Sequence, residues 1–275
     1  MNIEHRKSSS IGVFDSGVGG LTVLKEIRRV MPHEDLIYLG DTARLPYGTK
    51  SPQSIARYAC QAAARLREED IKLLVIACNT ASAVALEALQ GQLAPLPVIG
   101  VVEPGATAAV AARPGAEHLV LATEATVRLG AYSAAITRRD EKASVRELAC
   151  ELLVSLAEEG WVDGSIATDI LQRYLAQLAP HERAPDCVIL GCTHFPLLRD
   201  AIAAVFDEGT AIVDSASTTA EVVRAMLERL KLGNEQHRTG AVRLLATDGA
   251  SRFARVGGHF LGESLAASNI ELVDL

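Results

Sequence analysis

The sequence contains no apolar run that is long enough to cross a membrane. Its longest apolar run, at residues 73–78, is far shorter than the roughly 20 residues that a transmembrane helix needs. The first ten residues are polar and charged, so they resemble neither a secretory signal nor a membrane anchor. We therefore expect a cytoplasmic protein without a membrane partner.

Positive charge is sparse as well. The chain has 27 Lys and Arg against 34 Asp and Glu, which gives a net charge of −7. Adjacent basic residues form only pairs, as at residues 28–29 and 138–139, and pairs do not make the basic stripe that follows a phosphate backbone. Nucleic acid is therefore not expected as the primary partner.

Cysteine is scarce, with five residues at irregular spacing: Cys60, Cys78, Cys150, Cys187 and Cys192. An odd number without an export signal indicates reduced thiols in a cytosolic setting. Three of them, Cys60 and Cys150 in predicted helices and Cys187 at the start of a predicted strand, are interpreted as small buried hydrophobic residues.

What the sequence does contain is typical of a folded α/β protein. With 275 residues, the chain is long enough for one large domain or two smaller ones. Its composition, 49% apolar and 22% charged residues, is that of an ordinary globular protein. Short apolar runs alternate with amphipathic stretches, as in parallel strands joined by helices. The predicted strands are residues 11–14, 36–39, 73–77, 98–102, 119–122, 187–190, 211–213 and 242–246. Helical periodicity predicts helices at residues 52–69, 145–156 and 166–178.

One pattern occurs twice along the chain. The strand before residues 78–80 leads into Cys-Asn-Thr, and the strand before residues 192–194 leads into Cys-Thr-His. A weaker pair places Asp-Ser-Gly at residues 15–17 and Thr-Glu at residues 123–124 after two further strands. Together the two pairs predict two related α/β halves.

Four segments rich in small polar residues follow predicted strands, at residues 15–17, 41–48, 78–80 and 192–194. In an open parallel sheet, ligands bind at the carboxyl ends of the strands. Cys78 and Cys192 differ from the other cysteines because each lies where a strand gives way to a helix, and a helix start favours a thiolate.

Two other interpretations of these segments were weighed. The glycines at residues 17–20 lack the Gly-Lys-Ser/Thr of a phosphate-binding loop, and Thr22 stands where a dinucleotide fingerprint has its third glycine, so a tight turn is expected there. A zinc site of Cys187, Cys192 and His194, with or without Cys78, lacks a second close ligand pair, which argues against it. A disulfide between the site cysteines is geometrically conceivable, but a reducing cytosol disfavours it.

Six segments resemble the glutamate racemases of the aspartate/glutamate racemase superfamily, and the resemblance runs from residue 11 to the end of the chain. The segments are IGVFDSGVGGLTVL at residues 11–24, YLGDTARLPYGTKS at 38–51, ACNTAS at 77–82, VIGVVEPG at 98–105, ATEATV at 122–127 and LGCTHFPLL at 190–198. The resemblance implies two pseudo-symmetric α/β domains with mostly parallel sheets and the active site at their interface. We expect one domain from residues 1–98 plus 212–275 and the other from residues 99–211.

The resemblance also implies roles for individual residues. Cys78 and Cys192 would exchange the α-proton of glutamate, one on each face, without a cofactor or a metal. Asp15 and His194 would assist these thiols. Glu158 and Asp41 fall on further positions of the catalytic set. The expected substrate contacts are Asp15, Ser16, Tyr47, Gly48, Asn79, Thr80, Thr123, Thr126, Thr193 and His194.

The resemblance further implies supply of D-glutamate for peptidoglycan and leaves a homodimer open. Two residues depart from the family pattern, Glu151 in place of the usual proline and Phe195 in place of the common tyrosine. The alternatives to glutamate racemase are an aspartate racemase of the same superfamily and a non-catalytic protein that binds acidic amino acids.

The chemistry explains why two cysteines are needed. Removing a proton from one face of a carbon and returning one to the other face requires two groups on opposite sides, one a thiolate and one a thiol. A nearby carboxylate disfavours a thiolate, so we interpret Asp15 as a proton acceptor from Cys78. His194 is expected to accept from Cys192 and to stabilise the anion once protonated. No lysine for a pyridoxal Schiff base occurs in the four site segments.

Overall fold

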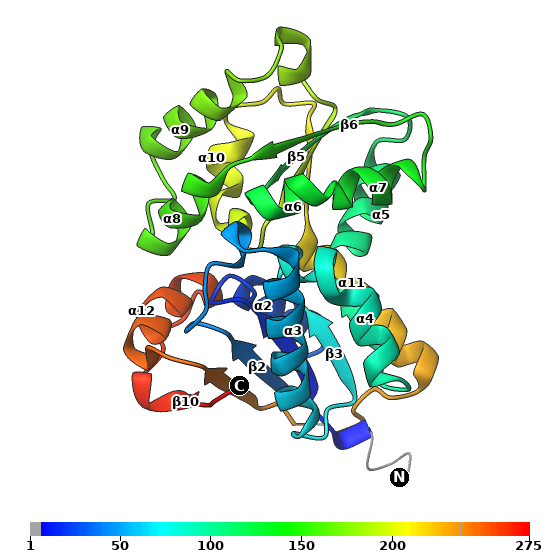
Figure 1. The fold of residues 1–275 in the computed structure, drawn as a ribbon, viewed down its shortest axis with the longest axis vertical. Coiled ribbons are helices and arrows are strands. Elements are labelled where there is room, and N and C mark those ends of the chain that lie inside the picture. The colour runs from blue at the N-terminus through cyan, green and yellow to red at the C-terminus, as the bar shows by residue number, and fades with distance from the viewer. Residues whose placement is uncertain (1–6, 237) are drawn as a thin grey trace.

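The computed structural model describes residues 7–236 and 238–275, so the first six residues of the polar start lie outside it. The chain forms two parallel sheets, which lie in two lobes, one above the other in Figure 1. The first lobe has the strand order β10 (Ile270–Leu272), β9 (Val242–Ala246), β2 (Leu36–Gly40), β1 (Ile11–Asp15), β3 (Leu73–Ile76) and β4 (Val98–Gly100). The second lobe has the order β6 (Ser144–Ala149), β5 (Glu117–Ala122), β7 (Cys187–Gly191) and β8 (Ala211–Asp214).

The two sheets share one topology. The order β2-β1-β3-β4 in the first lobe corresponds to β6-β5-β7-β8 in the second, and every pairing is parallel. Cys78 follows β3 and Cys192 follows β7, so the two cysteines occupy equivalent places. The predicted pseudo-symmetric α/β fold is confirmed, with β9 and β10 added to the first sheet.

Helices connect the strands and cover the sheets. They are α2 (Leu21–Val30), α3 (Pro52–Arg67), α4 (Asn79–Leu93), α5 (Val102–Ala112), α6 (Glu124–Leu129), α7 (Ala131–Thr137), α8 (Glu151–Glu159), α9 (Ser165–Leu175), α10 (Arg199–Ala203), α11 (Ser215–Leu230) and α12 (Ala250–Leu261). Short 3-10 turns lie at η1 (Tyr47–Thr49), η2 (Pro180–Arg183), η3 (Phe195–Leu198) and η4 (Ala267–Asn269). No helix within the described ranges has the length and apolar character to span a membrane.

Two of the predicted helices are confirmed, since α3 covers most of residues 52–69 and α9 most of 166–178. Helix α3 begins as the sequence indicates: the Ser51 side chain accepts a hydrogen bond from the Ser54 N–H at 3.3 Å, with a proline in the first turn.

Several predicted boundaries were wrong. The predicted helix at residues 145–156 is two elements, the strand β6 followed by α8, because the apolar spacing of an exposed edge strand runs by chance into that of the helix. Cys150 therefore does not lie in a helix but at the N-cap of α8. The predicted strand at residues 98–102 ends at Gly100, and β10 was not predicted.

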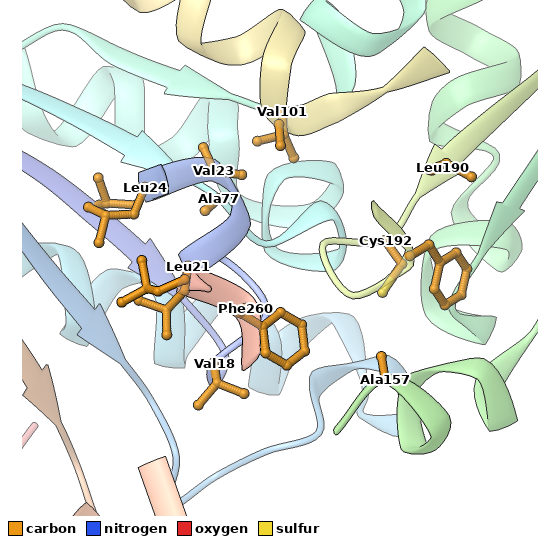
Figure 2. Packing of buried hydrophobic residues seen from close by; sticks show 14 of the residues in the cluster. Val18, Leu21, Val23, Leu24, Ala77, Val101, Ala157, Leu190, Cys192 and Phe260 are labelled. Atoms are coloured by element: carbon orange, nitrogen blue, oxygen red, sulfur yellow. The ribbon is translucent and has the colours of Figure 1, made fainter. Parts of the chain in front are cut away.

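One buried cluster joins the lobes. Leu21 and Phe260 from the first lobe belong to it together with Ala157 and Leu190 from the second (Figure 2). Helix α11 packs on α2 in the first lobe and on α5 in the second. Burial of one such leucine contributes about 1.5–3 kcal/mol, so this shared core holds the lobes in a fixed relation.

The expected domain boundaries at residues 98 and 212 fall inside β4 and β8. Because β4 pairs with β3 and β8 pairs with β7, we propose instead that the chain crosses between the lobes after each of these strands is complete. In this division the first lobe ends with Gly100 and resumes after Asp214.

Candidate active site

The four polar segments predicted at the carboxyl edges of the strands come together between the lobes. They surround a cavity lined by Ser16, Pro46, Tyr47, Gly48, Cys78, Asn79, Thr80, Thr123, Glu151, Val154, Cys192, Thr193 and His194. Its free volume is about 40 Å³, which is room for only a few water molecules. Ten of the predicted site residues line this cavity, while Asp15, Asp41, Thr126 and Glu158 lie behind them.

Cys78 opens on the cavity from the first lobe. It is the N-cap of α4, and its sulfur accepts from the Ala81 N–H at 3.4 Å and lies 3.5 Å from the Ser16 hydroxyl. Burial and the neighbouring Asp15 carboxylate nevertheless raise the pKa of the Cys78 thiol to about 12. At neutral pH, with the cavity free of substrate, Cys78 is therefore a thiol.

Asp15 lies directly beneath the cavity and is buried. One carboxylate oxygen accepts from the Gly17 N–H at 2.9 Å, whereas the other has no hydrogen-bond partner among the described residues. Burial raises the pKa of Asp15, although the nearby His194 opposes this shift. A carboxylate of this kind is a stronger base than an exposed aspartate.

Cys192 opens on the same cavity from the second lobe and has a histidine as its partner. The Cys192 sulfur lies 3.8 Å from Nδ1 of His194, and Nε2 of the same ring lies 3.2 Å from the Glu158 carboxylate. Burial lowers the pKa of His194, but the hydrogen bonds with Cys192 and Glu158 outweigh it and raise the pKa to about 10. His194 is therefore an imidazolium at neutral pH, which stabilises negative charge on the neighbouring sulfur.

The glycine-rich segment before α2 serves close packing. The expected turn forms before α2, but none of the glycines at residues 17–20 has a positive φ, so backbone conformation alone does not require glycine there. A Cβ on Gly19 would lie 2.4 Å from both His194 Nδ1 and Thr193 Oγ1, and a Cβ on Gly20 would lie 2.6 Å from the Asp15 side chain. The two glycines let the start of α2 approach Asp15 of the first lobe and the loop of Thr193 and His194 of the second.

Asp41 does not reach the cavity. Its carboxylate accepts from Tyr47 Oη at 2.5 Å and Arg44 Nε at 2.7 Å, and its second oxygen accepts from Thr247 at 3.0 Å. Asp41 therefore holds the loop that brings Tyr47 and Gly48 to the cavity wall.

A group of hydroxyls and one amide complete the wall. Thr80, Thr123 and Thr126 contact one another through their Oγ1 atoms at 2.9–3.2 Å. Tyr132 donates to Oδ1 of Asn79 at 2.7 Å, while Nδ2 of Asn79 has no partner among the described residues. The wall thus offers donors suited to carboxylate groups.

Comparison with known proteins agrees with this geometry. The family model described as Asp/Glu/Hydantoin racemase matches residues 11–223. The chain belongs to this racemase family. The glutamate racemase of Geobacter metallireducens is 48% identical over 256 residues, which cover 93% of this chain and 94% of that protein.

Solved structures place the chain among the glutamate racemases of this family. The crystal structure of the Francisella tularensis enzyme in complex with D-glutamate is 35% identical, has a TM-score of 0.89 and covers 98% of both chains. The aspartate racemase of Picrophilus torridus is only 15% identical with a TM-score of 0.56, and that likeness shows the fold alone.

Residues that the motifs did not single out also contribute to the site. Glu151 lines the cavity and accepts from the Glu124 N–H at 2.5 Å, so the departure at this position concerns the cavity itself as well as α8. Arg252 of α12 donates to Glu158 at 2.7 Å. Glu151 follows the carboxyl end of β6, which the sequence analysis assigned to a helix, and Arg252 lies on a helix that only the fold brings here.

The weighed zinc site is not formed. Cys187 stands at the opposite end of β7 from Cys192, roughly 16 Å away along an extended strand. Across residues 7–236 and 238–275, no group of three or more His, Cys, Asp or Glu side chains is arranged to hold a metal ion. All five cysteines are free thiols.

Proposed function

We propose that this chain is a glutamate racemase that moves the α-proton between Cys78 and Cys192 without a cofactor. The observation that carries the proposal is that the two thiols open on one cavity from equivalent places in opposite lobes. A substrate carbon between them would present one face to each sulfur.

We propose that the charges beside the two sulfurs prepare the substrate-free site for such a reaction. Burial and Asp15 keep Cys78 a thiol by raising its pKa, and the His194 imidazolium places a positive charge 3.8 Å from the Cys192 sulfur. With one enantiomer, Cys192 would take the α-proton while Cys78 gives its own to the opposite face. With the other enantiomer, Cys78 must first lose its proton and Cys192 must gain one. We propose that Asp15, whose raised pKa makes it a suitable base, accepts the proton of Cys78, and that His194 gives its proton to Cys192.

The two carboxylates of glutamate would be held by hydroxyl, amide and backbone N–H groups. We propose Ser16, Asn79, Thr80, Thr123 and Thr193 as contacts, with the loop at Tyr47 and Gly48 opposite them. Thr126 supports the threonine group from behind, and Asp41 supports Tyr47. Because the cavity holds only a few water molecules, binding of glutamate has to widen it, and closure afterwards excludes water from the thiols.

We further propose that the protein acts in the cytoplasm, supplies D-glutamate for peptidoglycan and works as a homodimer or a monomer. Glutamate is preferred over aspartate because relatives that are 40% or more identical over nearly the whole chain are glutamate racemases.

The test is incubation with L-glutamate in D2O, followed by measurement of α-deuteration and optical rotation. Wild type is expected to racemise glutamate, and Cys78→Ala and Cys192→Ala are each expected to lose racemisation. Cys60→Ala, a half-buried cysteine on α3, is the matched control and is expected to keep it. Racemisation by either site variant would overturn the two-cysteine mechanism. Faster turnover of aspartate would favour the aspartate racemase, and binding without deuteration would favour a binding protein.

A further inference from the structure

Glu158 divides its two carboxylate oxygens between two partners in different lobes. Oε1 lies 3.2 Å from His194 Nε2 on the second lobe, and Oε2 accepts from Nη2 of Arg252 at 2.7 Å. Arg252 belongs to α12, which packs on α2 of the first lobe, whereas Glu158 belongs to α8 of the second. The carboxylate is therefore clamped across the interface.

We propose that Arg252 is a positioning residue of the active site, which fixes Glu158 so that His194 stays directed at Cys192. The inference rests on the proposed function, since it assigns a role in the same proton transfer. Arg252 touches neither sulfur nor the cavity that the two thiols share.

Glu158 needs such a clamp because it stands beside open space. A second cleft, of about 240 Å³, is bordered by Glu158, Arg252 and Asp248. A glutamate side chain has several accessible rotamers, and its bond to His194 is long at 3.2 Å. Without Arg252, the Glu158 side chain can rotate so that its carboxylate turns into this cleft and binds water there.

The effect would pass from Glu158 to His194. The groups that act on His194 are Cys192, Glu158 and Asp15, and the edge of the Phe260 ring packs against it with centroids 5.0 Å apart. The hydrogen bond from His194 has the largest effect on the pKa of Glu158 and lowers it. Burial raises this pKa, and Arg252 lowers it further. A Glu158 that turns away removes one of the two hydrogen bonds that keep His194 protonated.

Positioning and simple charge predict opposite shifts. If Arg252 acted only as a nearby positive charge, its removal would raise the pKa of His194 and move the alkaline limb of activity to higher pH. If it holds Glu158 in place, its removal lowers the pKa of His194 and moves that limb to lower pH. The sign of the shift therefore separates the two roles.

The experiment measures kcat/KM for glutamate racemisation against pH in wild type, Arg252→Ala, Arg252→Lys and Arg255→Ala. Arg255 lies exposed on the same helix and is the matched control. We expect Arg252→Ala to lose about tenfold in kcat/KM at neutral pH, which is the size of one charge-assisted hydrogen bond, with its alkaline limb at lower pH. Arg252→Lys should recover part of the loss, and Arg255→Ala should match wild type.

A double-variant cycle completes the test. If Arg252 acts through Glu158, adding Arg252→Ala to Glu158→Gln causes no further loss of kcat/KM. Full additivity, an unchanged profile of Arg252→Ala or a limb moved to higher pH would each overturn the positioning role. A wild type that does not racemise glutamate would instead refute the proposed function, so the two failures are distinguishable. Thermal unfolding of each variant shows that the comparison is between folded proteins.

Discussion

The two sides of the cavity occupy equivalent places in the fold but differ in charge. On the side of Cys78 the nearest ionisable group is a carboxylate, Asp15, which together with burial raises the pKa of the thiol to about 12. On the side of Cys192 the nearest is an imidazolium, His194, with a pKa of about 10. One thiol therefore lies beside a negative charge, and the other lies beside a positive charge.

This difference teaches that a symmetric backbone does not require symmetric chemistry. The strand orders match, yet the last residue of β1 is Asp15 while the last residue of β5 is Ala122. An unequal pair places a protonated thiol on one face and a sulfur with a cationic partner on the other, which suits proton transfer across a carbon.

The largest expected effect comes from displacing His194, the partner of Cys192, while the Cys78 side stays unchanged. Gly19→Ala places a methyl group 2.4 Å from His194 Nδ1, so the ring has to move by about 1 Å or more. We expect kcat/KM for glutamate to fall about 100-fold, the usual consequence of such a displacement in an active site. Racemisation measured by optical rotation reports the loss.

Gly91→Ala is the control for this variant, because Gly91 lies in α4 with open space around its Cα. Its activity should equal that of wild type, and the better helix propensity of alanine should stabilise the fold by up to about 1 kcal/mol. Wild-type activity in Gly19→Ala would show that the contact between α2 and His194 does not set the ring position.

A smaller effect should appear in the reactivity of the two thiols. Both are 5% exposed and line one cavity, so iodoacetamide has similar access to each. Near neutral pH we expect Cys192 to be alkylated at least about tenfold faster than Cys78, because the thiolate is the nucleophile and only Cys192 has a cationic partner. Peptide mass spectrometry measures both rates in one sample.

The pH dependence follows from His194. Its raised pKa means that the imidazolium is present at neutral pH and is lost as the pH rises through about 10, so kcat/KM should fall over the same range.

In the alkylation experiment, equal rates for Cys78 and Cys192 near neutral pH would contradict the assigned difference between the two thiols. The half-buried Cys60 serves as an internal reference.

The sequence predicted the parts of the site that lie in continuous segments. Strand ends followed by polar residues and a helix located Cys78 and Cys192, because in a parallel sheet every such end lies at one edge. The edge strand β6 was mistaken for helix because alternation along a half-exposed strand is weak, with only Leu148 of its side chains fully buried.

Contacts between distant segments could not be predicted in this way. Arg252 is separated from Glu158 by 94 residues, and nothing in the local pattern of α12 marks it. Gly19 was interpreted from the sequence only as part of a turn. Its packing role could not be predicted, because only the folded chain reveals that His194 and Thr193 occupy the space of its missing side chain.

The smallest expected effect concerns Glu151, which lines the cavity but is a partner of neither Cys78 nor Cys192. Its carboxylate lines the cavity and accepts from the Glu124 N–H, so it brings negative charge close to a substrate that carries two carboxylates of its own. Glu151→Gln keeps an oxygen to accept that hydrogen bond and removes the charge. We expect KM for glutamate to fall about two- to threefold with little change in kcat, as for a partly screened charge interaction.

Glu124→Gln is the control, because that side chain is 60% exposed and lies outside the cavity lining. A rise in KM of Glu151→Gln would mean that the carboxylate holds the substrate ammonium, and Glu151 would then join the binding groups.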